Sequence, residues 1–375
     1  MSTSVFDAIV IGAGIVGAAC ADKLSREGLR VAIVEKDLVG GGATAAGMGH
    51  IVVMDDSEAQ FALTRYSQQL WIDLKPDLPD EVEYRQCGTL WIAADEEEMA
   101  EVGRKHRYYS DRNVPVEMID GVKLANLEPN LRPNLMGALL VAEDAVIYPP
   151  CAAHFLVERS KRNGAETFLG VAVRQINNGS LDLSDGTHLS AAVIINATGA
   201  WAPDLTPGID IKSRKGHLVI TDRYPDFVRH QLVELGYLKS AHSSSRDSVA
   251  FNVQPRSTGQ VLIGSSRQYG VEYKEVDDAI LSRMLHRALE YMPALSTVSA
   301  IRTWTGFRAA TTDKLPLIGP WPENSSLLLA TGHEGLGITT SMGTAALIAA
   351  HVTGNTPPIP LEPYLASRAL DHAHA

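Results

Sequence analysis

Short apolar runs alternate with a glycine turn and a helical stretch at the start of the chain. Residues 6–11 form an apolar run that predicts a short buried strand. A glycine-rich turn and an alanine-rich stretch, which favours a helix, come next, and Gly28 is placed to end that helix. A second apolar run, "LRVAIVEK", predicts a strand that finishes at Glu35. The order strand, turn, helix, strand predicts a βαβ unit.

Two later apolar runs both end in Ala-Thr-Gly. The first is a predicted buried strand at residues 193–197, which ends in Thr198-Gly199. The second ends at residues 330–332 and opens another glycine turn, which is followed by a helix of small residues. A strand that stops in small residues favours a place where a ligand or another stretch of backbone comes close.

The segments between these elements have a different pattern. Residues 1–75, 145–215 and 305–375 carry α/β patterns, whereas "RQCGTLWIAAD" and "SVAFNVQPRSTGQVLIGSS" alternate or run as strands with Gly and Pro turns. The pattern therefore predicts an α/β protein that also contains strands without intervening helices.

Composition narrows the class of protein. A chain of 375 residues, 45% of them hydrophobic, is long enough for two domains or one large α/β domain. The formal net charge of −11 argues against a nucleic-acid-binding surface, and we expect no nucleic-acid partner. Cys20, Cys87 and Cys151 form no CxxC motif or Cys/His cluster, so we expect neither a disulfide framework nor a metal site. The N-terminus has no basic region and only a short apolar run, so we expect a cytoplasmic protein, with association to a membrane or a larger complex left open.

The first glycine turn has the spacing of a dinucleotide-binding motif. Gly12 permits the tight turn, Gly14 lets the backbone approach a diphosphate, and Gly17 allows close helix packing. Glu35, 18 positions after Gly17, is placed to accept the ribose hydroxyls and would repel a 2′-phosphate, which disfavours NADP. The alternative is a purely structural turn.

A run of small residues, "GGGATAAGMGH", follows the second predicted strand. Such a run lets the chain lie against a long, bent cofactor, and Thr44 within it is a candidate donor to a phosphate. The alternative is a flexible loop.

These motifs together resemble a known family. The first glycine turn with Glu35, the small-residue run, "EDAVIYPP", "VIINATGAWA", "GFRAATTDKLPLIGP" and "LATGHEGLG" occur in an order and spacing that resemble the FAD-dependent amine oxidoreductases of the D-amino-acid oxidase superfamily. That group includes glycine oxidase, sarcosine oxidase and D-amino-acid dehydrogenases. The resemblance covers almost the whole chain. Within the group, "GMGHIVVMDDSEAQFALTRYSQQLW" is most similar to the flavin subunits of D-hydroxyproline dehydrogenases.

The resemblance implies a fold and a domain division. A discontinuous, Rossmann-like FAD-binding domain would comprise residues 1–75, 145–215 and 305–375. An α+β substrate domain, built on a mainly antiparallel sheet that roofs the flavin, would comprise residues 76–144 and 216–304.

The resemblance also implies how FAD is held. The first glycine turn and the end of the second strand would hold the ADP half, and Val173, which is alternatively plain core, would contact adenine through its backbone. The small-residue run would lie along the diphosphate and flavin, and the first Ala-Thr-Gly would approach from the sheet. The second glycine turn would point a helix start at the flavin ring, where helix dipoles favour the negative charge of reduced flavin. The residues so implied are Gly12, Gly14, Ile15, Val16, Gly17, Glu35, Lys36, Gly42, Ala43, Thr44, Gly47, Met48, Gly49, Val173, Ala197, Thr198, Gly199, Gly332, Gly335, Leu336, Gly337, Ile338 and Thr339. Some sarcosine oxidase-like enzymes attach FAD through a cysteine that "TWTGFRAATTD" lacks, so we expect the FAD to be non-covalent.

Four residues are implied at the substrate. Arg308 occupies the "G-x-R-P" position and would bind the substrate carboxylate, although Ala309 replaces the usual proline. The alternative is a structural ion pair, with Asp313 as one partner. His50 and His333 are candidates near the flavin and the substrate amine, with a structural role as the alternative for His50. Asn252 and Gln254 are two residues apart on a predicted roof strand, so both would point to one face, towards the same site. The alternative is that they are exposed polar residues.

The resemblance implies oxidation of a D-amino acid or cyclic secondary amino acid, such as D-proline or hydroxyproline, to the imine by hydride transfer to flavin N5. We expect a dehydrogenase that passes electrons to a quinone, a protein subunit or oxygen, as a homo- or hetero-oligomer. It would be cytoplasmic, or peripheral to the inner membrane through a partner. The alternatives are an amine oxidase of the glycine or sarcosine type and an electron-relay subunit of a heteromeric complex. Selectivity would depend on residues 50–110 and 237–273.

Overall fold

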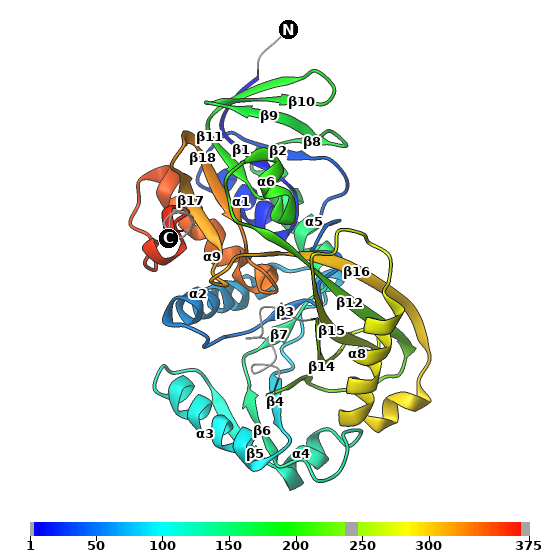
Figure 1. The fold of residues 1–375 in the computed structure, drawn as a ribbon. Helices are drawn as coiled ribbons and strands as arrows, with labels where there is room; N and C mark the ends of the chain where they lie inside the picture. Colours follow the sequence, from blue (N-terminus) through cyan, green and yellow to red (C-terminus); the bar gives the residue numbers. More distant parts are fainter. Residues whose placement is uncertain (1–3, 237–246, 369–375) are drawn as a thin grey trace.

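Two eight-stranded sheets organise the chain in a computed structural model, which describes residues 4–236 and 247–368 (Figure 1). Residues 1–3, 237–246 and 369–375 lie outside the described residues, and with them part of the segment 237–273 on which selectivity was expected to depend. The first sheet follows the order β17-β18-β11-β1-β2-β8, with β10 and β9 attached beside β11. Its strands are β1 (Ser4–Ile11), β2 (Val31–Glu35), β8 (Glu166–Leu169), β9 (Val173–Asn177), β10 (Ser180–Leu183), β11 (His188–Asn196), β17 (Leu317–Trp321) and β18 (Asn324–Thr331).

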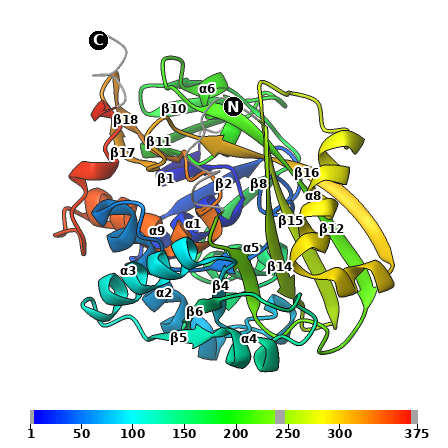
Figure 2. The ribbon, with the colours of Figure 1, turned by 60° about the horizontal axis from the view of Figure 1, so that its bottom comes forward.

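The centre of the first sheet is parallel and buried on both faces. Strand β1 pairs in parallel with β2 and β11, and β11 pairs in parallel with β18. Ala8 and Val10 pack under helices α1 (Ile15–Arg26), α5 (Pro149–Arg162) and α9 (Gly337–Thr353), whereas Ile9 and Ile11 pack on the opposite face. Burial on both faces explains why the second half of β1, residues 8–11, is an unbroken apolar run. Figure 2 shows α1 and α9 side by side, and the predicted strands and both turn–helix units are confirmed.

The second sheet has the order β16-β12-β15-β14-β13-β4-β6-β5 and is antiparallel except between β13 and β4. The mainly antiparallel sheet expected as a roof is therefore present. Its strands are β4 (Thr89–Ala93), β5 (Val116–Asp120), β6 (Gly137–Val141), β12 (Lys212–Arg223), β13 (Gln231–Glu234), β14 (Ser248–Pro255), β15 (Gln260–Tyr269) and β16 (Ala300–Ala310). Helix α8 (Asp278–Tyr291) packs on β14 and β15, where the rings of Phe251 and Tyr291 stack at 4.8 Å.

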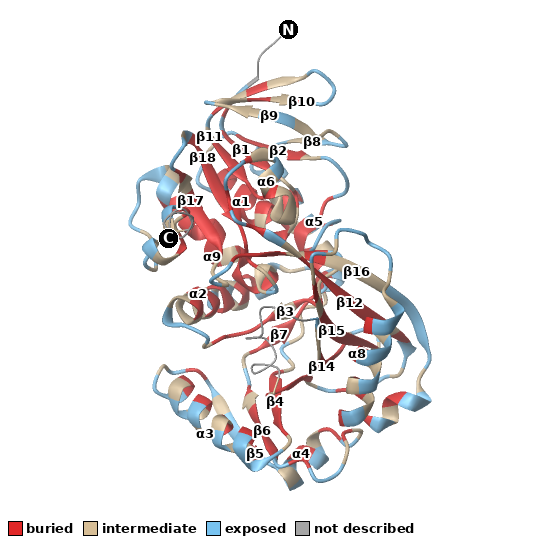
Figure 3. Cartoon of the chain, in the orientation of Figure 1, coloured by how far each residue is buried: buried red, intermediate tan, exposed pale blue. Residues whose placement is uncertain are grey.

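Smaller elements connect the sheets. Strands β3 (His50–Ile51) and β7 (Ala145–Val146) form a two-stranded sheet, and helix α2 (Glu58–Leu74) packs against α9. The other helices of the described residues are α3 (Glu96–Ser110), α4 (Gly121–Leu127) and α6 (Ala202–Leu205), with short 3-10 helices η1 (Lys75–Asp77), η2 (Asp80–Val82), η3 (Gly199–Trp201), η4 (Pro293–Thr297) and η5 (Glu362–Tyr364). Figure 3 shows buried residues concentrated in the first sheet, in α9 and in the roof strands, with exposed residues on the outer sides of α3 and α8. Within the described ranges, no helix has the length and apolar character needed to cross a membrane.

The roof packs tightly against the small-residue run at Gly306. A Cβ added to Gly306 of β16 would lie 2.2 Å from the Cβ of Ala46, so a side chain cannot be placed there. The proposed domain boundaries at 215/216 and 304/305 fall inside the long strands β12 and β16. We keep the two-domain division as a proposal.

Candidate active site

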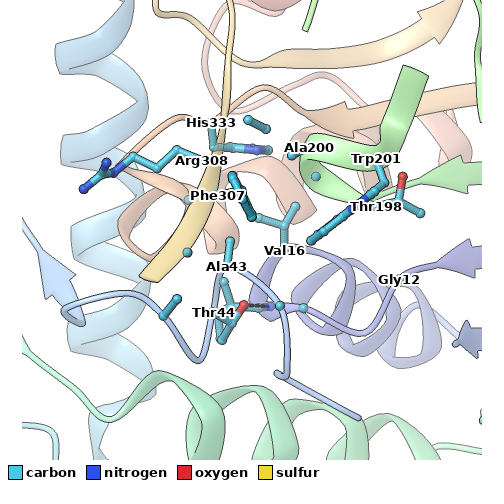
Figure 4. Close-up of a pocket in the computed structure, with 18 of the residues that line it drawn as sticks. Gly12, Val16, Ala43, Thr44, Thr198, Ala200, Trp201, Phe307, Arg308 and His333 are labelled. Carbon is cyan, nitrogen blue, oxygen red and sulfur yellow. Dashed lines mark hydrogen bonds between the residues drawn. The ribbon is translucent and has the colours of Figure 1, made fainter. Parts of the chain in front are cut away.

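A cavity of about 490 Å³ is lined by residues of both large sheets and of the small-residue run (Figure 4). Its volume falls in the range of cofactor and substrate sites. Glu35, Lys36 and Val173 line one part, and Arg308 and Asn252 line another. The cavity brings together all of the predicted cofactor and substrate residues except Gly17, Leu336 and Thr339.

The first glycine turn is shaped by close backbone contacts. Gly12 has φ +98°, and a Cβ there would lie 2.7 Å from the carbonyl oxygen of Ala197. A Cβ on Gly17 would lie 1.9 Å from the carbonyl oxygen of Gly12, so Gly17 sets the contact between helix and turn and does not line the cavity. Helix α1 begins at Ile15 with Gly14 as its N-cap, which directs backbone N–H groups towards the cavity.

Glu35 is tied to this turn. Its Oε2 accepts a hydrogen bond from the backbone N–H of Ala13 at 2.8 Å, and its Oε1 accepts one from that of Asp37 at 2.8 Å. A carboxylate oxygen accepts more than one hydrogen bond, so both oxygens keep the capacity to bind ribose hydroxyls.

The wall beside Glu35 contains an aromatic residue that sequence reasoning missed. Trp201 lines the cavity, and its ring lies 4.8 Å from Lys36 Nζ and 3.8 Å from a Cβ built on Gly42. Figure 4 shows Trp201 next to Thr198. An aromatic residue shortly after the strand-ending Ala-Thr-Gly is the sequence signal that could have found it.

The small-residue run forms ordered turns. Thr44 Oγ1 accepts a hydrogen bond from the backbone N–H of Ile15 at 2.9 Å, which leaves the hydroxyl proton available for donation. Gly49 has φ +97°, and a Cβ there would lie 2.0 Å from the carbonyl oxygen of Ile147. Close packing against several elements therefore fixes the path of the run.

The second glycine turn is bound to the roof sheet by a hydrogen bond and an ion pair. Gly332 has φ +79°, and a Cβ there would lie 2.7 Å from Thr311 Cγ2. The backbone N–H of Glu334 donates to the carbonyl oxygen of Ala309 at 2.7 Å, and the Glu334 carboxylate forms an ion pair with Arg214 of β12. Glu334 also lines the cavity, although the sequence did not point to it.

Arg308 reaches the cavity from β16. Its Nη1 donates to the carbonyl oxygen of Ser266 at 3.0 Å, and a Cβ built on Gly216 would lie 2.4 Å from the same nitrogen. Asp313 forms an ion pair with Arg368 at 2.7 Å, and the suggested ion pair between Arg308 and Asp313 is not among those that the described residues form. Glycine at 216 thus makes room for the guanidinium at the cavity wall.

Two histidines line the cavity in different settings. The pKa of His50 is lowered to about 4, chiefly by burial. The positive charge of Arg308 also lowers this pKa, whereas the interaction with the Gln254 side chain raises it. The His50 Nε2 is buried and has no hydrogen-bond partner among the described residues. His333 instead has its Nε2 at 2.9 Å from Thr344 Oγ1, and burial lowers its pKa to about 3. Figure 4 shows the side chains of His333 and Arg308 pointing in opposite directions.

Asn252 and Gln254 of β14 lie close to the same region. Asn252 lines the cavity, and its buried Oδ1 has no hydrogen-bond partner in the described part of the chain. Gln254 Nε2 donates to the carbonyl oxygen of Met48 at 2.6 Å, which supports the small-residue run from behind. His50 and Asn252 therefore bring unsatisfied polar atoms to the cavity wall, as expected where a polar ligand binds.

The residues present fit a dinucleotide with a flavin. A Cβ built on Gly199 would meet no atom within 4 Å, and one on Gly335 would meet only Arg308 at 3.9 Å, so both glycines leave space that a side chain would occupy. The same cavity contains a diphosphate-type turn, an acid for ribose and the start of a second long helix, α9. No group of three or more His, Cys, Asp or Glu side chains within residues 4–236 and 247–368 is arranged to hold a metal ion.

Comparisons with known proteins point to the same cofactor. Residues 7–351 match the family model DAO, described as FAD dependent oxidoreductase. Glycine oxidase of Geobacillus kaustophilus is 27% identical, over 97% of this chain and 97% of its own. Hydrogen cyanide synthase subunit HcnC of Pseudomonas aeruginosa is 27% identical, over 97% and 96%.

Solved structures show the same fold. The crystal structure of the G. kaustophilus glycine oxidase superposes with a TM-score of 0.87 at 26% identity, covering 98% of this chain and 99% of that one. L-proline dehydrogenase from P. horikoshii gives a TM-score of 0.89 at 22% identity, covering 99% of both chains.

Proposed function

We propose that this chain, which belongs to the DAO family of FAD-dependent oxidoreductases, oxidises a D-amino acid or a cyclic secondary amino acid, such as D-proline or hydroxyproline, to the imine. Oxidation of an amine or amino acid with FAD is the activity class of its relatives and of this chain. The observation that carries the narrower proposal is the single cavity shared by the dinucleotide-type turn at Gly12 and the guanidinium of Arg308.

Arg308 would bind the substrate carboxylate. A guanidinium presents a planar fork of N–H donors that matches both oxygens of a carboxylate. The Ser266 carbonyl oxygen binds this guanidinium at the cavity wall, and the absence of a side chain at Gly216 leaves room for it. Bound FAD supplies the acceptor for the hydride that leaves the substrate α-carbon. The protein would supply the position of that carbon and the electrostatics around it.

His50 and Asn252 would contact the substrate amine. With a pKa near 4, His50 is neutral at neutral pH, so it acts as a hydrogen-bond partner and not as a cation. The unsatisfied Oδ1 of Asn252 is an acceptor for an amine N–H. Helix α9 would favour negative charge near its start at Gly337, where we place the flavin ring.

Three observations support the preference for a cyclic substrate. Met48 and Leu218 give the cavity wall near Asn252 an apolar part and pack in one buried cluster. Residues 47–71, which resemble hydroxyproline dehydrogenase flavin subunits, include His50 and most of helix α2, which packs against α9. A protein named L-proline dehydrogenase shares the fold.

The electron acceptor defines two alternatives. A glycine-type oxidase would reduce oxygen, and the relatives named glycine oxidase support that alternative. An electron-relay subunit is supported by the relative named as a subunit of hydrogen cyanide synthase. We favour a dehydrogenase that passes electrons to a quinone or protein partner, in the cytoplasm or held at the inner membrane by that partner.

A substrate screen tests the proposal. The purified holoprotein would be mixed anaerobically with D-proline, hydroxyproline, D-alanine or glycine, and flavin absorbance would be followed by stopped flow. We expect rapid bleaching with a cyclic amino acid and slow reoxidation when air is admitted. Bleaching only by glycine with fast reoxidation would favour the oxidase, and no bleaching by any amino acid would overturn the proposed function.

A further inference from the structure

Thr339, in the first turn of helix α9, holds the strand that carries His50. Its hydroxyl donates to the carbonyl oxygen of His50 at 2.9 Å and accepts from the backbone N–H of Val52 at 3.2 Å. The side chain is fully buried and does not line the cavity. Its hydroxyl therefore faces protein backbone, although the resemblance had implied a cofactor residue.

The other edge of this strand is also held. His50 pairs with Val146 of β7, and the backbone N–H of Ile147 donates to the carbonyl oxygen of Gly49 at 2.8 Å. These bonds fix the strand relative to β7 but leave its distance from α9 to be set by other contacts. Among the side-chain hydrogen bonds of the described residues, the two made by Thr339 link this strand to the helix start.

The helix start is itself fixed. The indole N–H of Trp71 in α2 lies 3.2 Å from the carbonyl oxygen of Ile338 and 3.1 Å from that of Thr339, and it donates to both. Trp71 is fully buried. Trp71 thus holds the backbone at Thr339 through contacts that do not involve the strand carrying His50.

We infer that Thr339 is a positioning residue, whose hydroxyl aligns His50 with the start of α9 and so with the reacting part of the cavity. The inference deepens the proposed function, because it rests on contact between His50 and the substrate. It assigns Thr339 to substrate orientation and not to cofactor affinity.

The chain offers a matched control next to Thr339. Thr340 is also buried, but its hydroxyl donates at 2.8 Å to the carbonyl oxygen of Leu336 in its own helix turn. Thr339→Val and Thr340→Val remove the same atom type from neighbouring positions. Thr339→Ser keeps the hydroxyl, and Thr339→Ala is a second variant without it should valine prevent folding.

The first experiment observes His50 directly and needs no turnover. Holoprotein labelled at histidine Cε1 would be studied by NMR, and the His50 resonance would be assigned by its loss in His50→Gln. We expect Thr339→Val or Thr339→Ala to shift the His50 resonance, while Thr339→Ser and Thr340→Val leave it in place. An unchanged His50 resonance in both hydroxyl-free variants would overturn the inference.

The second experiment measures the consequence for catalysis. We expect Thr339→Val to lower the rate constant of flavin reduction about tenfold at unchanged FAD affinity, as a small misplacement near the reacting atoms does. In a His50→Gln background the same substitution should have no further effect. Full additivity of the two substitutions, or a loss of FAD affinity in Thr339→Val, would contradict the inference. If no amino acid reduces the wild-type flavin, the proposed function fails, and the NMR result still decides whether Thr339 positions His50.

Discussion

The hydroxyl of Thr44 accepts a hydrogen bond from the backbone N–H of Ile15 at 2.9 Å, joining the small-residue run to the first turn of α1. Thr44→Val would leave this buried N–H without its partner and remove the hydroxyl that we propose donates to the diphosphate. Since a lost buried hydrogen bond costs about 1–3 kcal/mol, we expect FAD affinity to fall roughly 10- to 100-fold. The dissociation constant is measured by flavin fluorescence while the apoprotein is titrated with FAD. Thr44→Ser should stay close to wild type, and an equal dissociation constant for Thr44→Val would refute the assignment.

Arg308 should control binding of the carboxylate specifically. Arg308→Met removes the cation, and charge-assisted pairs contribute about 1.5–3 kcal/mol, so KM for an amino acid should rise roughly 10- to 100-fold. For a cyclic amine without a carboxylate, such as pyrrolidine, KM should be the same in Arg308→Met as in the wild type. Steady-state kinetics with both substrates makes the comparison. A parallel loss for proline and pyrrolidine would show that Arg308 acts on the fold and not on the carboxylate.

The two glycines of the second turn should respond differently to a side chain. A Cβ on Gly337 would lie 3.3 Å from the Cβ of His333 and 3.8 Å from Val16 Cγ2, whereas one on Gly335 would meet only Arg308 at 3.9 Å. We expect Gly337→Val to lower the flavin content of purified protein and Gly335→Val to raise KM with flavin content preserved. Absorbance ratios at 450 and 280 nm, together with kinetics, distinguish these effects. Normal flavin content and normal reduction in both variants would count against the placement of the flavin ring.

Burial of neutral His333 predicts a pH-dependent stability. Its pKa is lowered to about 3, so below its ordinary value of 6.5 the unfolded chain binds a proton that the folded chain does not. The contribution of neutral His333 to the free energy of unfolding is fully present above pH 6.5 and is lost as the pH falls towards 3. Between pH 7 and pH 5 the free energy of unfolding should fall by about 2 kcal/mol for this reason.

A second buried group has the opposite sign. Burial raises the pKa of Asp144 to about 7, so the folded chain keeps a proton there and gains stability as the pH falls below 7. The histidine contribution must therefore be measured as a difference between wild type and His333→Gln in chemical unfolding at both pH values. We expect the loss from pH 7 to pH 5 to be about 2 kcal/mol smaller in the variant. Equal losses would mean that His333 is not held neutral.

Local patterns predicted much of this architecture. The unit from β1 to β2 and the turn before α9 were predictable because strand, glycine turn and helix follow one another directly in the chain. Trp201 and Glu334 were missed because their importance depends on contacts with Lys36 and Arg214, which are distant in sequence. The role inferred for Thr339 depends on the strand that passes its hydroxyl, and no sequence period encodes that crossing.

The central claim is that one ligand spans both glycine turns and leaves room for an amino acid at Arg308. A crystal structure of the holoprotein with pyrrole-2-carboxylate, a planar analogue of proline, tests it most directly. We expect the diphosphate at Gly12–Gly17, the flavin ring at Gly332–Gly337 and the analogue carboxylate on Arg308. A flavin ring away from the second turn, or an analogue bound with its carboxylate elsewhere, would contradict the account.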